Sequence, residues 1–520
     1  MPLISIRWWS DGVGCSNLTI DIKRQGADVV GLALAESGRL CRMMFSGIRG
    51  EIRATLGLAT PIVVGLVASH AMQVVDAVMI GHIGVDPLAG AAFGGNLFMI
   101  CLLFVFGLGT AMTVMIGEAH GAGSQDRARE VLRHGLLIGS LAAGLLTVIF
   151  PWIVLKTDWW HLGQPAEVLA EAGPYLIYLS ATLLPLYAFI CLKSYSDAMG
   201  HPWVPLLVSL SGIVVNMGLN WVFIYGNLGV PRMELEGAGL ATLIARFYLL
   251  AVMWAWLAWK RTHPVRWGIR EFFGVSWRAK WNLVKLSVPI SLQIVFEVLA
   301  FNGVAFLMGW FEDGARNVAA HAIAINCAAM AFMVPLGVGF AVTIRIGQAQ
   351  GEGNGVRSRQ IAMGGVGVST VFMVGVALFF VWSREWLPFL FLSNDGSARV
   401  EQVHALASLL LIYAAAFAVF DGLQTALIAA LRGYRDVRIP TMIIFIAYWL
   451  VCLPLGFFLG FGPEQSGGIP APIREIVDTS WGFDLGPVGL WIGLVMGLLL
   501  IALALSARLA WLLRHLKAMG

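Results

Sequence analysis

Four ionisable residues lie within long apolar runs of this 520-residue chain. Asp76 lies in MQVVDAVMIG, Glu297 in LQIVFEVLAF and Asp421 in FAVFDGLQTAL, and Arg246 is the one basic member of the set. A carboxylate withdrawn from water either takes a proton or binds a cation. The three acids are therefore candidate Na⁺ or proton sites. The alternative is structural: a neutral acid held by a hydroxyl or backbone group, or an ion pair with Arg246.

Two asparagines and a set of aromatic residues extend this chemistry. Asn216 and Asn220 are four residues apart, so they share one helix face. Amide oxygens bind hard cations beside a carboxylate, although interhelical hydrogen bonding is the common role of Asn in membrane helices. Aromatic faces attract organic cations, and packing or lipid contact is the alternative. The aromatic set comprises Tyr187, Tyr195, Tyr413, Phe417, Phe420, Tyr448 and Trp449.

The composition places these residues in a polytopic membrane protein. Hydrophobic residues make up 58% of the chain and charged residues 12%, against roughly 25% charged residues in soluble domains. The mean hydropathy is +0.80. A net charge of +4 excludes a nucleic-acid-binding surface, and six dispersed cysteines exclude a zinc ribbon or a disulfide framework.

Twelve apolar segments are long enough to cross the ~30 Å hydrocarbon core as helices. The predicted fold is therefore all-α, with twelve transmembrane helices. These segments are 54–82, 92–118, 132–155, 169–192, 203–226, 237–259, 282–310, 317–348, 359–382, 401–431, 438–461 and 485–514.

Lys and Arg are distributed unequally between the two sides. The even-numbered loops, their flanking helix ends and the C-terminal tail hold 20 of these residues, and the odd-numbered loops hold 6. Basic residues remain on the cytoplasmic side, so both termini are predicted to be cytoplasmic, in a bacterial inner membrane. Residues 261–281 then form a basic cytoplasmic linker. Residues 1–50 differ from the rest and are interpreted as an N-terminal extension, unless translation begins at Met43 or Met44.

The chain contains an internal repeat. GLGTAMTVMIGEAHGAG at 107–123 matches GVGFAVTIRIGQAQGEG at 337–353, at a constant offset of 230 residues. Pro61 similarly matches Pro289. Six spans per repeat give both halves the same orientation, related by a pseudo-two-fold axis along the membrane normal. The sequence thus predicts two six-helix bundles, at 51–260 and 282–515, and an alternating-access transporter.

Several runs resemble one known family. ATPIVVGLVASHAMQVVDAVMIGHIG, LSVPISLQIVFEVLAF, IRIGQAQGEG, VVNMGLNWVFIYG and FDGLQTALIAALRGYRD are similar to the NorM-like branch of the multidrug and toxic compound extrusion (MATE) family. The resemblance covers about residues 50–515. It implies a secondary antiporter that exports organic cations and drugs in exchange for Na⁺ or H⁺.

The resemblance also implies residue roles. In the N-terminal half, Asp76, Asn216, Asn220 and the hydroxyl of Thr242 match a cation site. In the C-terminal half, Glu297 and Asp421 match a cation and drug site. Arg246 departs from the family pattern, one turn from Thr242. We expect it either to neutralise Asp76, leaving the C-terminal site as the working one, or to face a polar cavity.

Other classes of function are disfavoured. The sequence has no GxxxxGK[ST], HExxH or GxSxG motif, so a P-loop ATPase is excluded and a membrane hydrolase is disfavoured. We therefore expect no enzymatic activity, no cofactor beyond a coupling ion and no obligate protein partner. A flippase for lipids or lipid-linked oligosaccharides is the alternative transporter. The mainly acidic charges within the spans favour cationic cargo instead.

Overall fold

The computed structural model describes residues 4–8, 16–20, 26–156, 166–259, 277–392, 397–465, 469–470 and 481–519. The chain divides into two compact units, Met1–Glu51 and Ile52–Gly520. The first unit contains an antiparallel pair of strands, β1 (Ile4–Trp8) and β2 (Ser16–Ile20), with Ile4 opposite Ile20. The described part of the second unit is built from helices, so the all-α prediction holds for the membrane domain.

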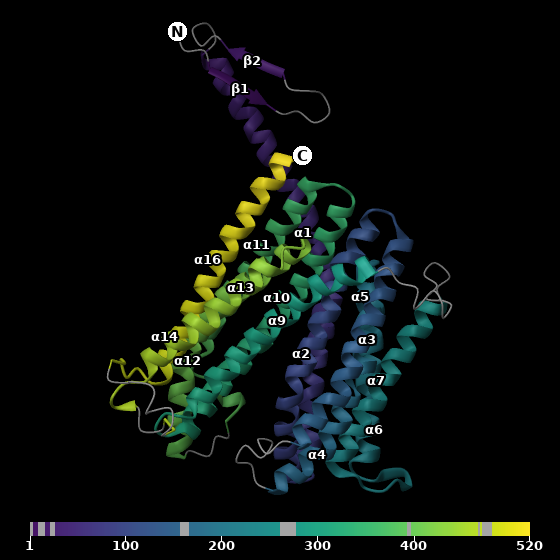
Figure 1. Ribbon diagram of the computed structural model, residues 1–520. Coiled ribbons are helices and arrows are strands. Elements are labelled where there is room, and N and C mark those ends of the chain that lie inside the picture. Colours follow the sequence, from purple (N-terminus) through teal and green to yellow (C-terminus); the bar gives the residue numbers. More distant parts are fainter. Residues whose placement is uncertain are drawn as a thin grey trace. The chain divides into compact units, whose positions relative to one another are not determined.

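Six membrane spans form the first half of the second unit (Figure 1). The helix α1 reaches into this unit from the first one, and α4 and α5 together make one span. The bounds are α1 (Gly26–Gly81), α2 (Val85–Gly121), α3 (Gln125–Lys156), α4 (Ala166–Ala181), α5 (Leu183–Ala198), α6 (Trp203–Phe223), the 3₁₀ turn η2 (Asn227–Gly229) and α7 (Glu234–Trp259).

Six further spans form the second half, so the prediction of twelve membrane-spanning helices is confirmed. The segments α13, η4 and α14 together make one span, and η4 is π-helical. The bounds are α9 (Trp277–Met308), α10 (Gly314–Gly351), α11 (Gly355–Ser383), the 3₁₀ turn η3 (Leu387–Leu390), α12 (Ala398–Gly433), α13 (Arg438–Phe445), η4 (Ile446–Cys452), α14 (Leu453–Gly460) and α16 (Pro487–Met519).

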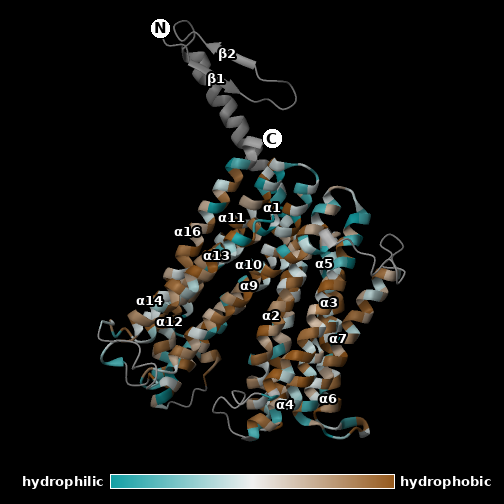
Figure 2. Ribbon diagram, in the orientation of Figure 1, coloured by the Kyte–Doolittle hydropathy of each residue, from teal (hydrophilic) through white to brown (hydrophobic). Residues whose placement is uncertain are grey.

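Apolar residues cover the middle of the helices, and hydrophilic residues gather toward their ends (Figure 2). Large apolar side chains point outward in both halves, among them Leu141, Val148, Val371 and Leu378, each more than 65% exposed. In water such a surface would aggregate, but in a bilayer it contacts lipid. Backbone polar groups must be satisfied within each span in hydrocarbon, which is why the spans are helical.

The two halves have separate hydrophobic cores. One core contains residues from Phe98 to Leu257 almost throughout. The other contains residues from Ala300 to Leu509 almost throughout. The predicted pair of six-helix bundles corresponds to these two cores. Of the predicted basic linker, residues 261–276 lie outside the described residues, whereas 277–281 form the beginning of α9.

The repeated glycines bring α2 and α10 into direct backbone contact between the two bundles. A Cβ atom on Gly117 would lie 2.8 Å from the carbonyl oxygen of Ile344, and one on Gly347 would lie 2.9 Å from that of Val114. Both pairs are related by the repeat offset of 230 residues. The two helices therefore meet across the pseudo-two-fold axis that the repeat predicts.

One turn later the same symmetric contact is tighter still. Gly121 faces the carbonyl group of Gln348, and Gly351 faces the carbonyl group of Glu118. Only glycine allows two helix backbones to approach this closely. We call the side on which α2 and α10 end, at Gly121 and Gly351, the closed end of the second unit.

Candidate functional site

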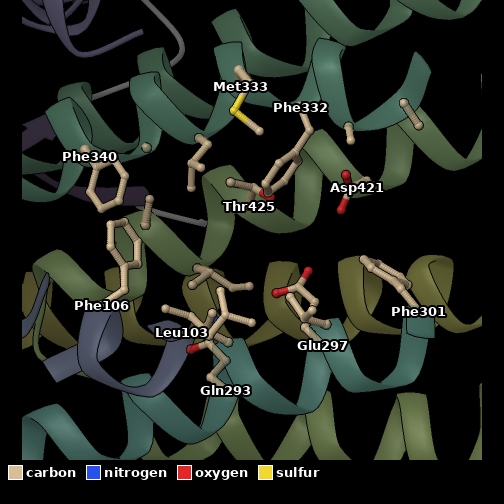
Figure 3. Close-up of a pocket in the computed structure, with 18 of the residues that line it drawn as sticks. Leu103, Phe106, Gln293, Glu297, Phe301, Phe332, Met333, Phe340, Asp421 and Thr425 are labelled. Atoms are coloured by element: carbon tan, nitrogen blue, oxygen red, sulfur yellow. The ribbon is translucent and has the colours of Figure 1, made fainter. Parts of the chain in front are cut away.

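A cavity of about 330 Å³ lies between α2, α9, α10 and α12. Its walls are mostly apolar and aromatic, and Glu297 of α9 and Asp421 of α12 project into it (Figure 3). Phe106 of α2 meets Phe340 of α10 edge to face, with ring centroids 5.9 Å apart. Both bundles therefore contribute to the lining, and the two predicted acids of the second half share one site.

Glu297 is held by polar groups from two other spans. The amide Nε2 of Gln424 donates a hydrogen bond of 2.5 Å to Glu297 Oε1. The hydroxyl of Tyr448 lies 3.2 Å from Gln424 Oε1 and 3.5 Å from Glu297 Oε1. Tyr448 belongs to the π-helical η4, a local irregularity that is frequent at functional sites. The carboxyl group of Glu297 thus has an orientation fixed by α12 and η4.

Asp421 is the less satisfied of the two acids. Its side chain is 4% exposed, and its Oδ1 atom has no hydrogen-bond partner in the described residues. It interacts electrostatically with Glu297. A buried carboxylate oxygen without a donor favours a bound proton or cation. The pair therefore offers one fixed and one unsatisfied carboxylate to the cavity.

Arg432 is a cavity residue that the sequence analysis missed. We took Glu297 and Asp421 to have no basic residue in their own spans, but Arg432 lies in α12, eleven residues after Asp421, and lines the same cavity. It is 8% exposed, and its Nε atom has no partner in the described residues. Its position on the Asp421 helix face, three turns on, was the available signal.

Gln424 was also missed. It follows Asp421 by three residues, hence by about one helix turn, and this i, i+3 relation was readable in FDGLQTAL. Of the predicted aromatic set, Phe417 lines the cavity and Tyr448 contacts Gln424. By contrast, Tyr187 and Tyr195 are buried in the core of the first half, where the Tyr187 hydroxyl donates to the carbonyl of Gly135.

Asp76 and the two asparagines meet in the first half, between α1 and α6. Asn220 Nδ2 donates to Asp76 Oδ1 at 2.7 Å and to Asn216 Oδ1 at 3.2 Å. Asn216 Nδ2 and Asn220 Oδ1 are buried, without partners in the described residues. Rotating the Asn220 amide by half a turn would present its oxygen to Asp76, so this trio can offer three oxygen ligands to a hard cation.

Thr242 and Arg246 are less closely tied to Asp76. The hydroxyl of Thr242 donates to the carbonyl of Ala238 in its own helix, at 2.9 Å. Arg246 interacts electrostatically with Asp76, and among the described residues no direct ion pair joins the two. The arginine is therefore a nearby positive charge and not a ligand of the carboxylate.

Comparison with known proteins gives a consistent result over most of the chain. The MatE family model matches residues 61–222 and 289–458, one match in each half. A Mesorhizobium japonicum protein named "Probable multidrug resistance protein NorM" is 37% identical over 482 residues, which cover 90% of this chain and 94% of that protein. The "Multidrug resistance protein NorM" of Vibrio parahaemolyticus is 30% identical over 469 residues, covering 89% and 96%.

Solved structures share the fold. A multidrug resistance MATE family transporter described in an outward-facing conformation aligns with a TM-score of 0.76 at 21% identity, covering 91% of this chain and 98% of that one. A MOP superfamily transporter from Pyrococcus furiosus aligns with a TM-score of 0.77 at 19% identity, covering 90% and 97%. At these identities the likeness concerns the architecture of the helices.

Proposed function

This chain belongs to the MatE family of multi-pass membrane transporters, and we propose that it exports organic cations and drugs from a bacterial cell in exchange for Na⁺ or H⁺. The observation that carries the proposal is the pairing of Glu297 and Asp421 in one apolar, aromatic-lined cavity. Aromatic and aliphatic walls accept flat hydrophobic cargo, and the carboxylates supply its counter-charge.

Exchange follows from competition for the same carboxylates. A Na⁺ ion or proton at Glu297 or Asp421 removes the negative charge that holds an organic cation. Each ligand therefore lowers the affinity for the other, and by thermodynamic reciprocity the two effects are equal. The Asp76, Asn216 and Asn220 trio is proposed as a second cation site, which Arg246 weakens through its positive charge.

The cavity favours cationic over anionic cargo. Among the described residues that line it, two are acidic and one, Arg432, is basic. A flippase for pyrophosphate-linked lipids needs an excess of positive charge in its cavity, because phosphate oxygens require cationic donors. The charge balance at this site supports the exporter and not the flippase.

Transport by reconstituted protein tests the proposal directly. Proteoliposomes loaded with ethidium should release the dye when an inward Na⁺ or H⁺ gradient is imposed across the membrane. Imposing each gradient separately identifies the coupling ion, and an ionophore that collapses the gradient should stop the release. Dye movement that ignores both gradients would contradict the antiport.

We further propose that the closed end faces the cytoplasm, together with both termini, because the 20-to-6 distribution of Lys and Arg favours that orientation. Alkaline phosphatase fused after Gly520 should be inactive, since the enzyme folds only outside the cytoplasm. The same enzyme inserted at Leu228, in the exposed turn between α6 and α7, should be active. The opposite pattern would invert every loop.

A further inference from the structure

A second cavity, of about 470 Å³, lies at the closed end and is rich in positive charge. It is formed by the last part of α2, the beginning of α9 and the turn that leads into α13. We call it the basic pocket, and its polar lining comprises Asn282, Lys285, Arg435, Asp436 and Arg438. It is separate from the cavity of Glu297 and Asp421, and it is not involved in the proposed exchange.

The charges of the basic pocket are only partly balanced. Asp436 accepts a hydrogen bond of 2.6 Å from Arg508, and Arg435 forms an ion pair with Glu118. Lys285 and Arg438 have no acidic partner in the described residues, and Lys285 lies 5.6 Å from the centroid of the Trp281 ring. Two cations from different helices therefore point at one concave site with nothing to neutralise them, a combination that suits a phosphate group.

The position of these cations indicates that the phosphate belongs to a lipid. Lys285 and Arg438 lie near the first residues of their spans, Lys280–Met308 and Arg438–Gly460. From the pocket, an apolar stripe continues along α13 into the membrane, where Ile439, Met442 and Ile446 are 39%, 63% and 47% exposed. Their i, i+3, i+7 spacing places them on one face. Acyl chains can lie along that face, whereas a free anion gains nothing from it.

We propose that the basic pocket binds the headgroup phosphate of an anionic phospholipid, with the acyl chains along the exposed face of α13. Basic pockets between helices at the cytoplasmic surface are suited to such headgroups. Met115 of α2 also lines the pocket, and Glu118 of α2 pairs with Arg435. The lipid therefore contacts both bundles, and it stabilises the arrangement in which their closed ends meet.

Lipid titration of the purified full-length protein tests this assignment. Phosphatidylglycerol added to the detergent-solubilised protein should raise the melting temperature by about 2–4 °C, the scale of one kcal/mol of binding free energy. Phosphatidylcholine should have a smaller effect. Native mass spectrometry at room temperature counts retained phosphatidylglycerol molecules, and this readout does not depend on the thermal stability of a variant.

The double variant Lys285→Gln/Arg438→Gln should lose the preference for phosphatidylglycerol in both measurements. The matched control is Arg53→Gln/Arg359→Gln, which removes two exposed arginines outside the pocket and should bind lipid like the unmodified protein. Equal phosphatidylglycerol binding by the pocket variant would overturn the site. An equal stabilisation by inorganic phosphate would overturn its assignment to a lipid. Neither outcome depends on dye transport.

Discussion

Replacing Glu297 by glutamine is expected to reduce gradient-driven dye efflux to background while the protein still inserts and folds. Glutamine retains the size of the side chain and its contact with Gln424, which donates to Glu297 at 2.5 Å, but it has no negative charge. Contacts to a charged group are worth about 1.5–3 kcal/mol, so organic-cation affinity should fall about 10–150-fold. Equilibrium dye binding in detergent and efflux from proteoliposomes measure the two effects.

Two comparisons make this result specific to the cavity. Glu312→Gln removes an exposed acid in the loop that follows α9, so it should transport like the unmodified protein. Asp76→Asn should cause a smaller loss of efflux than Glu297→Gln, because Arg246 already offsets part of the Asp76 charge. An equal loss from both acid substitutions would point to two equivalent sites. Normal efflux by Glu297→Gln would refute the site assignment.

Replacing Gly121 by alanine is expected to prevent the closed end from forming and to abolish most transport. The new Cβ atom would overlap the carbonyl group of Gln348, which belongs to helix backbone and cannot rotate away. Such overpacking costs about 1–3 kcal/mol, whereas alanine gains only about 1 kcal/mol over glycine in helix propensity. The steric cost therefore outweighs the gain, and the two helices must separate.

The matched control for this substitution lies in the same helix. At Gly95 of α2 an added Cβ atom would meet nothing within 4 Å, so Gly95→Ala should keep full transport and lose no stability. Spin labels at Asp126 and Arg359, both exposed and at the first turns of α3 and α11, report the separation of the two bundles. Gly121→Ala should lengthen or broaden the distance distribution. An unchanged distribution together with normal efflux would exclude a gating role for this contact.

The sequence alone determined the membrane architecture. Apolar length, the distribution of Lys and Arg and the repeat at an offset of 230 residues are local or linear features, so they predicted twelve spans and their arrangement in two halves without any knowledge of packing. The buried acids Asp76, Glu297 and Asp421 were also readable, because an ionisable residue in an apolar span is exceptional wherever the span packs. The roles assigned to these acids remain proposals.

Only the tertiary structure decided which of these residues act together. Glu297 and Gln424 are 127 residues apart, and their contact depends on how α9 and α12 rotate about their axes, which no span pattern specifies. Arg432 reads from sequence as a basic residue at the end of a span, yet packing turns it into the cavity of the two acids. The repeated glycines were visible as a motif, but their meaning required two helices from different halves to meet backbone to backbone. Helix formation is decided within one segment, whereas the facing of side chains is decided by every neighbour at once.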